Sequence, residues 1–236
     1  MNKQGGISVF LPTRMGSERV ENKNTRLFAG IDGGLRRLKL KQLLELDCLK
    51  KIILSTNDPK SIDIVDRFFS GDDKILVLER PTELARSSTN LEDLVDYVPS
   101  VIKSEHILWT HVTSPFITSD MYEKMIDAYF KSLPKYDSLM SVNKVQNFLW
   151  SEEEGKVKNV RNNNKLKWPR TQDLDPLYEV NSGAFIFSRE GYMKLNDRIG
   201  VRPLLWKQNI IEGFDIDWEE DFYLAESLIQ AFKYEI

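Results

Sequence analysis

The chain has 236 residues, of which 41% are hydrophobic and 29% are charged, with 33 lysines and arginines against 36 aspartates and glutamates. This length and apolar content suit a single α/β domain over residues 1–236 and leave little room for two independent domains. The net charge of −3 argues against a general nucleic-acid or membrane-surface binder, so a local basic cluster would serve a small anionic ligand.

Short apolar runs rich in β-branched residues predict buried strands at 7–11, 51–55, 74–78 and 106–112. Helical spacing predicts helices at 35–46 and 59–69, and the capping box TNLE at 89–92 opens a third helix. Because strands and helices alternate, we expect an α/β fold with a doubly wound, mostly parallel, Rossmann-like sheet.

The alternation of strand and helix changes after a helix predicted at 120–131. A strand is predicted at 137–144, and the polar, turn-rich sequence that follows indicates an excursion from the main sheet over about residues 145–176. The sheet resumes at 178–187, and a helix from about 218 to 233 closes the chain.

Cys48 is the single cysteine, which excludes an intrachain disulfide and a cysteine-clustered zinc site and favours a reducing compartment. No stretch approaches the roughly 18 continuous apolar residues of a membrane span, and residues 1–6 contain no apolar signal-peptide core. We therefore expect a soluble, cytoplasmic protein with no nucleic-acid or membrane partner.

The first predicted strand ends in a small-residue loop that carries Arg14, Arg19 and Lys23. Gly16 and Ser17 let backbone N–H groups approach an anion closely, and the basic side chains supply positive charge. Loops at the carboxyl ends of parallel strands converge on one face, where α/β proteins bind ligands. The GxxxxGK[ST] and GxGxxG phosphate motifs are absent, so a solvated basic connection remains an alternative.

Polar residues also follow the second and third predicted strands. Asp58 and Pro59 come after the second strand, and this pair equally fits the start of a helix. Arg80 comes after the third strand, together with the hydroxyls of residues 87–89. A capped helix would explain the hydroxyls, so Arg80 is the residue here without a structural use.

His106 and His111 are the two histidines of the chain, and a lone histidine in an apolar strand is more often a hydrogen-bonded core residue than a catalyst. His111 is the better candidate, because it lies near the carboxyl end of its strand, beside Thr113 and Ser114. Neither histidine has a metal-ligating partner at suitable spacing, and no GxSxG elbow is present, which disfavours zinc chemistry and hydrolase triads.

Asp215 and Asp217 alternate in a segment predicted to be extended, so their carboxylates would point the same way and could share a divalent cation. Asp217 and Glu220 also fit a helix start, with Asp217 as the cap and Glu220 in the capping-box position. Both interpretations stay open for Asp217, whereas a helix start leaves Asp215 unexplained.

Six segments spread over nearly the whole chain carry further information: PTRMGSERVENKN (12–24), KKIILSTND (50–58), ERPTELARSST (79–89), THVTSPF (110–116), PRTQDL (169–174) and FDIDWEEDFYLAE (214–226). In the same order, they resemble motifs of the acylneuraminate cytidylyltransferase family, which makes CMP-sialic acid, CMP-Kdo and related CMP-activated acidic sugars. The combination of six motifs is far more specific than any one of them.

The resemblance implies a nucleotidyltransferase fold and a Mg²⁺-dependent enzyme that transfers CMP from CTP to the anomeric hydroxyl of an acidic 2-keto sugar and releases pyrophosphate. The nucleotide-binding residues it implies are Pro12, Arg14, Gly16, Ser17, Lys23, Asn24, Arg80 and Ser88. The catalytic residues are Arg14, Lys23, Asp215 and Asp217, of which the two aspartates would bind Mg²⁺. On the sugar side we expect His111, Thr113, Ser114, Arg170 and Gln172.

The excursion over 145–176 corresponds to a region that forms dimer contacts in the family, so we expect a homodimer in which Arg170 approaches the partner's site. The chain departs from the family pattern at Glu18, Glu21, His111 and Ile117. The family usually has Lys, Pro, Gln and Arg at these positions. Two alternatives therefore stay open: a nucleotide-binding regulatory relative without turnover, and a nucleotidyltransferase for a different sugar or nucleotide.

Overall fold

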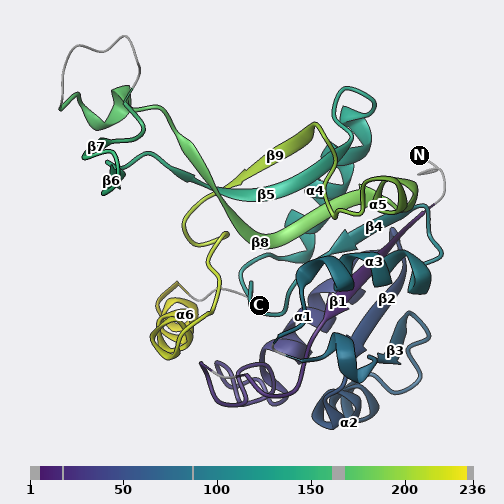
Figure 1. Cartoon of the computed structure of the whole chain (residues 1–236). Helices are drawn as coiled ribbons and strands as arrows, with labels where there is room; N and C mark the ends of the chain where they lie inside the picture. Colours follow the sequence, from purple (N-terminus) through teal and green to yellow (C-terminus); the bar gives the residue numbers. More distant parts are fainter. Residues whose placement is uncertain (1–5, 18, 87, 161–167, 233–236) are drawn as a thin grey trace.

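The computed structural model describes residues 6–17, 19–86, 88–160 and 168–232, and within them seven strands form one mixed sheet (Figure 1). In sheet order these strands are β3 (Ile75–Glu79), β2 (Leu49–Thr56), β1 (Ile7–Pro12), β4 (His106–Trp109), β8 (Leu177–Ser188), β5 (Ser138–Val145) and β9 (Pro203–Gln208). Strand β8 runs antiparallel to its neighbours β4 and β5, and the other pairs are parallel. The doubly wound, mostly parallel sheet predicted from the sequence is confirmed.

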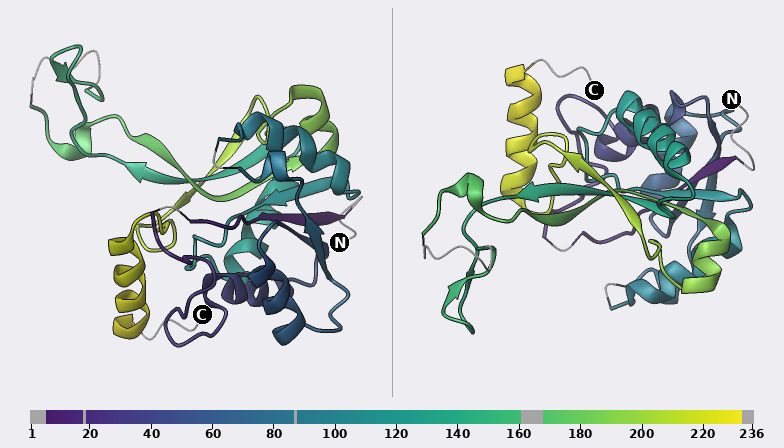
Figure 2. Two further views of the ribbon diagram at one scale, coloured as in Figure 1. Left: turned by 60° about the horizontal axis from the view of Figure 1, so that its bottom comes forward. Right: turned by 90° about the horizontal axis from the view of Figure 1, so that it is seen from above.

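Helices cover both faces of this sheet (Figure 2). The described α-helices are α1 (Gly34–Leu44), α2 (Pro59–Phe68), α3 (Leu91–Val101), α4 (Ser119–Ser132), α5 (Arg189–Leu195) and α6 (Glu219–Phe232). Alternate side chains of β1 serve opposite cores, because Val9 and Leu11 pack with α1 and α4 whereas Phe10 packs with α3 and α5. Among the helices described, none is long and apolar enough to cross a membrane.

Asp58 and Pro59 start helix α2, as one of the two interpretations of the sequence predicted. Asp58 is the N-cap, and its Oδ1 accepts the Lys60 backbone N–H at 3.1 Å. Its Oδ2 lies 3.1 Å from the guanidinium of Arg36, which is fully buried. This carboxylate therefore has a structural role at the first turn of α2 and in pairing a buried charge.

The capping box predicted at 89–92 is wrong. Helix α3 has Asn90 as its N-cap, with no side-chain hydrogen bond to the helix. The Thr89 hydroxyl instead donates to the Glu83 carbonyl at 2.6 Å, in the 3-10 turn η1 (Thr82–Leu84). The preceding turn therefore uses the hydroxyl that would have capped α3. Ser87, which the sequence grouped with Thr89, lies outside the described residues.

The chain leaves the main sheet between β5 and β8. Strands β6 (Trp150–Ser151) and β7 (Lys156–Val157) pair with each other as a separate antiparallel sheet, and the 3-10 turn η2 (Thr171–Asp173) precedes β8. These elements project from the body of the molecule (Figures 1 and 2). We call residues 146–160 and 168–176 the arm. It lies within the excursion predicted over about residues 145–176, of which Val145 belongs to β5.

Candidate active site

The carboxyl ends of the parallel strands bring distant loops to one edge of the sheet. The chain order reverses between β1 and β4, and α/β proteins bind ligands at such a switch point. The segment after β9 reaches the same edge, because the Ile216 N–H donates to the Thr113 carbonyl at 2.9 Å. This bond places Asp215 and Asp217 beside the loops that follow β1 and β4.

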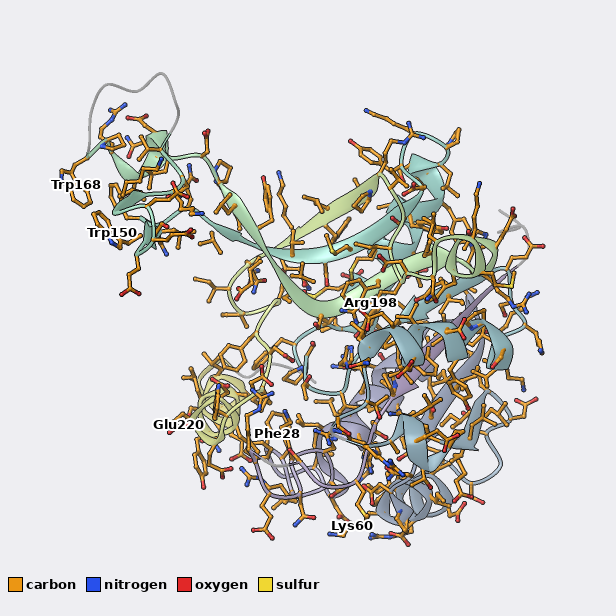
Figure 3. The ribbon with its side chains drawn as sticks, viewed as in Figure 1. Phe28, Lys60, Trp150, Trp168, Arg198 and Glu220 are labelled. Atoms are coloured by element: carbon orange, nitrogen blue, oxygen red, sulfur yellow. The ribbon has the colours of Figure 1, made fainter. Side chains whose placement is uncertain are left out.

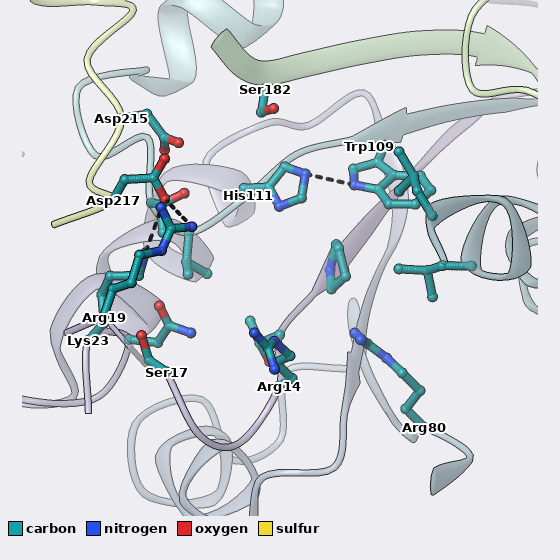
Figure 4. Close-up of a pocket in the computed structure, with 17 residues that line it drawn as sticks. Arg14, Ser17, Arg19, Lys23, Arg80, Trp109, His111, Ser182, Asp215 and Asp217 are labelled. Atoms are coloured by element: carbon teal, nitrogen blue, oxygen red, sulfur yellow. Dashed lines mark hydrogen bonds and ion pairs between the residues drawn. The ribbon is translucent and has the colours of Figure 1, made fainter. Parts of the chain in front are cut away.

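A cavity of about 490 Å³ opens at this edge (Figure 4). Its lining includes many of the predicted site residues, namely Pro12, Arg14, Ser17, Lys23, Asn24, Arg80, His111, Thr113, Asp215 and Asp217. The lining also includes residues that the sequence analysis did not propose as site residues, among them Arg19, Trp109 and Ser182. The fold therefore gathers side chains from the segments after β1, β3, β4 and β9, and from within β8, around one space.

Three predicted residues of the loops lie outside this cavity's lining. Gly16 lines a neighbouring cavity of about 510 Å³, and Asp58 and Lys60 line that cavity as well. Ser88 is exposed. Ser114 is buried, its hydroxyl has no hydrogen-bond partner in the described part of the chain, and its carbonyl accepts from the buried Lys39 at 2.9 Å.

Arg170 and Gln172 lie on the arm, away from the cavity of the same chain (Figure 1). The Arg170 Nε donates to the Asp173 Oδ2 at 2.8 Å, and the Gln172 carbonyl accepts from the Gln146 side chain at 3.3 Å. Among the four departures from the family pattern, Glu18 lies outside the described residues and Ile117 is a fully buried core residue.

Lys23 joins the basic loop to the aspartate segment. Its Nζ donates to the Ile216 carbonyl at 2.7 Å and lies 3.8 Å from the Asp217 Oδ1. Burial lowers the pKa of Lys23, and the nearby Asp217 and Asp215 carboxylates oppose that shift. Arg19 lies 3.2 Å from the same Asp217 oxygen (Figure 4). Two cations therefore hold the Asp217 carboxylate at the cavity wall.

Asp215 is held in a less polar environment than Asp217. Burial raises the pKa of Asp215, and a hydrogen bond with the Thr113 side chain opposes the shift. Within the described residues, the Asp215 Oδ1 is buried and has no hydrogen-bond partner. An unsatisfied buried carboxylate oxygen that lines a cavity fits a metal ligand.

The described residues contain no cluster of three or more histidine, cysteine or acidic side chains arranged for a metal. A Mg²⁺ ion commonly takes one or two protein carboxylates and completes its shell with substrate phosphates and waters. The Asp215 and Asp217 pair at a basic cavity therefore fits Mg²⁺ bound together with a phosphate ligand, rather than an ion caged by protein groups alone.

Of the two interpretations left open for Asp217, the helix start with Asp217 as cap and Glu220 in the capping-box position is wrong. Helix α6 begins at Glu219, and the Asp221 Oδ2 accepts the backbone N–H groups of Asp217 and Trp218 at 3.0 and 2.8 Å. Since Asp221 is the third helical residue, it occupies the capping-box position that the sequence assigned to Glu220. The Asp217 carboxylate is consequently turned to Arg19 and Lys23.

Arg80 is fixed at the end of the cavity away from the aspartates (Figure 4). Its Nε donates to the Ser55 hydroxyl at 3.1 Å, and its Nη2 donates to the Ser55 carbonyl at 2.5 Å. Burial lowers the pKa of Arg80 to about 10, so the guanidinium stays charged at neutral pH. Leu91, Leu94 and Trp109 line the cavity as well.

An open α/β sheet with a basic loop after its first strand and two aspartates after its last strand defines a protein of the nucleotidyltransferase type. The family model described as Cytidylyltransferase matches residues 8–235 of the chain. The chain therefore belongs to the cytidylyltransferase family.

Curated relatives are similar at low identity over most of the chain. The CMP-N,N'-diacetyllegionaminic acid synthase of Legionella pneumophila is 24% identical over 234 residues, which cover 95% of this chain and 96% of that protein. The N-acylneuraminate cytidylyltransferase of Streptococcus agalactiae serotype III is 23% identical over 90% of this chain. The match spans about half, 51%, of that streptococcal protein.

Solved structures show the same fold. CMP:2-keto-3-deoxy-manno-octonic acid synthetase in complex with CTP matches with a TM-score of 0.65 and 15% identity, over 96% of this chain and 99% of that chain. The 4-diphosphocytidyl-2C-methyl-D-erythritol synthase from Anaerococcus prevotii matches with a TM-score of 0.64 and 16% identity, over 95% and 98%. These likenesses confirm the predicted nucleotidyltransferase fold.

Proposed function

We propose that this cytidylyltransferase transfers CMP from CTP to the anomeric hydroxyl of an acidic 2-keto sugar of the sialic acid, other nonulosonic acid or Kdo type. The hydroxyl oxygen forms a bond to the α-phosphorus while the bond from that phosphorus to the β-phosphate oxygen breaks. Pyrophosphate leaves with the bonding electron pair, and the hydroxyl proton passes to water. The names of the legionaminic acid and acylneuraminate relatives support this substrate class.

The observation that carries the proposal is the charge arrangement of the cavity. Four basic side chains, Arg14, Arg19, Lys23 and Arg80, line it together with the carboxylates of Asp215 and Asp217. Phosphoryl and nucleotidyl transfer depends mainly on alignment and on neutralising charge at the phosphates. A basic cavity with an adjoining carboxylate pair is suited to that task.

Asp215 and Asp217 would hold Mg²⁺, which supplies positive charge against the triphosphate when it is bound. Arg14, Ser17 and Lys23 would bind the phosphates, and Lys23 also keeps the aspartate segment against the basic loop through the Ile216 carbonyl. Arg80 would bind at the nucleoside end, where leucine and tryptophan side chains offer an apolar surface.

A further cavity of about 620 Å³, on the acceptor side, adjoins the basic cavity of Figure 4 and would receive the acceptor sugar. Both cavities are lined by Ser182, Asp215 and Asp217, so this boundary is where an acceptor hydroxyl would meet the α-phosphate. Ser182 has a φ of 57°, which a non-glycine residue adopts at an energetic cost, as often occurs at functional sites. Asn143 and Asn181 also line this cavity, and their side-chain amides hydrogen-bond to each other and to Gln208 and Gly213, which fixes the cavity wall.

We expect pyrophosphate release with CTP and Mg²⁺ for one acidic sugar in a panel of sialic, legionaminic, pseudaminic and Kdo-type acceptors. Without sugar and at equal concentration, CTP should raise the melting temperature more than UTP, ATP or GTP, because stabilisation grows with the ratio of ligand concentration to Kd and reaches about 2.7 kcal/mol at a ratio of 100. The panel should include 2C-methyl-erythritol 4-phosphate as an acceptor without a carboxylate. Release with that acceptor alone, or no CTP response, would contradict the acidic-sugar assignment.

We further propose that the arm forms a homodimer and carries Arg170 toward the cavity of the second subunit. Phe148, Trp150 and Trp168 form an aromatic cluster on the arm, with ring centroids of Trp150 and Trp168 6.4 Å apart (Figure 3). Trp150 and Trp168 are 55% and 60% exposed, although large aromatic side chains stabilise a protein most when they are buried in a core or an interface. Burial in a subunit interface would remove this exposed apolar surface from water.

The double variant Trp150→Ser, Trp168→Ser should lower the mass measured by light scattering from two chains toward one at micromolar concentration. The loss of two buried aromatic contacts accounts for the expected dissociation. Val201→Ser is the matched control, since Val201 is 78% exposed and lies off the arm. A wild-type protein that is monomeric at millimolar concentration would rule out the dimer.

A further inference from the structure

His111 replaces the glutamine of the family motif, and its ring is fixed by Trp109, two positions earlier in the chain. The Nε1 of Trp109 donates to the Nε2 of His111 at 3.0 Å. An indole N–H has no acceptor capacity, so the histidine Nε2 must be the acceptor and must carry no proton. The neutral imidazole then bears its single proton on Nδ1.

Trp109 is itself rigidly placed. It is fully buried at the end of β4, where it pairs with Phe10 on one side and Phe185 on the other. Its ring makes an edge-to-face contact with Phe10 at 4.9 Å between centroids, and the Arg198 guanidinium lies 5.3 Å from its centroid. The indole N–H therefore points to His111 from a side chain with little freedom to turn away.

The second ring nitrogen of His111 faces the open part of the cavity (Figure 4). In that view His111 stands between Trp109 on one side and the Asp215 and Asp217 pair on the other. His111 lines the basic cavity and is absent from the lining of the acceptor-side cavity of about 620 Å³. Its Nδ1–H is consequently aimed at the ligand of the basic cavity rather than at the sugar.

Protonation of His111 would break this arrangement. A second ring proton on Nε2 would face the indole N–H and remove the hydrogen bond. The charged groups that act on the ring are Arg198 beyond β8, Arg80 after β3 and Lys23 after β1, and all three are cationic. Burial and these cations lower the pKa of His111 to about 3, so it has no general acid–base role at neutral pH.

We propose that His111, held by Trp109 with its proton on Nδ1, is a fixed hydrogen-bond donor to an oxygen of the bound nucleotide between its base and its β-phosphate. Trp109 is the positioning residue, and the inference rests on the proposed binding of CTP in this cavity. The acceptor oxygen belongs to the ribose or to the α-phosphate. His111 would take the place of the glutamine of the family motif as a hydrogen-bond donor, and its ring, unlike a side-chain amide, has only one N–H to offer in this tautomer.

The first part of the test needs no ligand. The chain has two histidines, so a long-range ¹H–¹⁵N spectrum of uniformly labelled protein has two ring systems, and His111→Gln identifies the one that disappears. We expect a protonated Nδ1 and an unprotonated Nε2 for His111, unchanged between about pH 5 and pH 8. A proton on Nε2, or a titration inside that range, would overturn the proposal.

Trp109→Phe keeps an aromatic ring but removes the indole N–H. We expect His111 in this variant to show both tautomers and to titrate at higher pH than in the wild type, although the three cations still oppose its protonation. A merely structural role for Trp109 would change the melting temperature without changing the tautomer. An unchanged His111 spectrum in a folded Trp109→Phe protein would therefore contradict the positioning role.

The second part is calorimetric binding of CTP and of 2′-deoxy-CTP without sugar. His111→Phe should weaken CTP binding about tenfold, and His111→Gln, which retains an N–H donor, should weaken it less than about threefold. If 2′-deoxy-CTP binds wild type and His111→Phe equally, the acceptor is the 2′-hydroxyl, whereas a retained tenfold difference assigns an oxygen of the α-phosphate or of the rest of the ribose. Wild-type protein that binds no CTP contradicts the proposed function, whereas equal CTP binding by wild type and His111→Phe contradicts this inference alone.

Discussion

Lys23→Ala should reduce kcat/KM for pyrophosphate release about 100- to 1000-fold, the cost of losing one well-placed charged contact to a transition state. The substitution removes a cation from the cavity and also removes the bond from Nζ to the Ile216 carbonyl, which holds the aspartate segment against the basic loop. The unfolding free energy should fall by only about 1 kcal/mol, the usual net value of one hydrogen bond. Steady-state pyrophosphate assays and denaturant unfolding measure the two effects separately.

The matched control for Lys23→Ala is Lys124→Ala. Lys124 is exposed on α4 and pairs with Asp120 one turn away, so its removal should change neither turnover nor stability by more than a few tenths of a kcal/mol. Wild-type turnover in a folded Lys23→Ala protein would show that Lys23 has no role in the reaction. A large loss of stability would instead assign Lys23 mainly to the fold.

Asp215→Asn should lower turnover about 100- to 1000-fold while leaving the melting temperature unchanged or higher. The change keeps the shape of the side chain and removes a charge whose Oδ1 is buried without a hydrogen-bond partner in the described structure. Stability should not fall, because a charge buried away from water destabilises the folded state and Asn carries none. Turnover should fall, because the variant lacks one of the two carboxylates proposed to hold Mg²⁺. A Mg²⁺ titration of activity and a thermal melt provide the two readouts.

Asp120→Asn is the control, because it makes the same change at an exposed carboxylate on α4, which pairs with the exposed Lys124. It should leave both the Mg²⁺ dependence and the melting temperature at wild-type values. Wild-type activity with an unchanged Mg²⁺ requirement in Asp215→Asn would remove Asp215 from the metal site. A protein that loses activity only together with its fold would leave Asp215 with a structural role alone.

The elements that the sequence predicted best are those with strong local patterns. The run predicted at 7–11 matches β1, and the one predicted at 51–55 lies inside β2, since buried central strands are continuously apolar. Helix α5 was not predicted, because its seven residues are too few for a clear helical period. Strand β9 was not predicted either. It lies at the edge of the sheet and is only partly buried, so its apolar pattern is weaker than that of the central strands.

The residues of the candidate site also divide into those with a recognisable local pattern and those without one. The basic loop and the Asp215 and Asp217 pair were predictable, because their residue types and spacing carry chemistry that can be read along the chain. Ser182 was not predictable, since its left-handed φ follows from the irregular pairing of β8 with β5. Trp109 has the pattern of a buried strand residue, and only its hydrogen bond with His111 distinguishes it.

By itself, the sequence determined the order of the central elements, the character of the loops and the motifs that point to cytidylyl transfer, because these depend on residues close together in the chain. Tertiary structure decided which loops meet. Lys23 and Ile216 are 193 positions apart yet joined by a hydrogen bond, and the capping residue of α6 is Asp221 because the helix begins at Glu219. Contacts between distant positions, and the exact turn at which a helix begins, depend on packing in three dimensions and leave no local pattern.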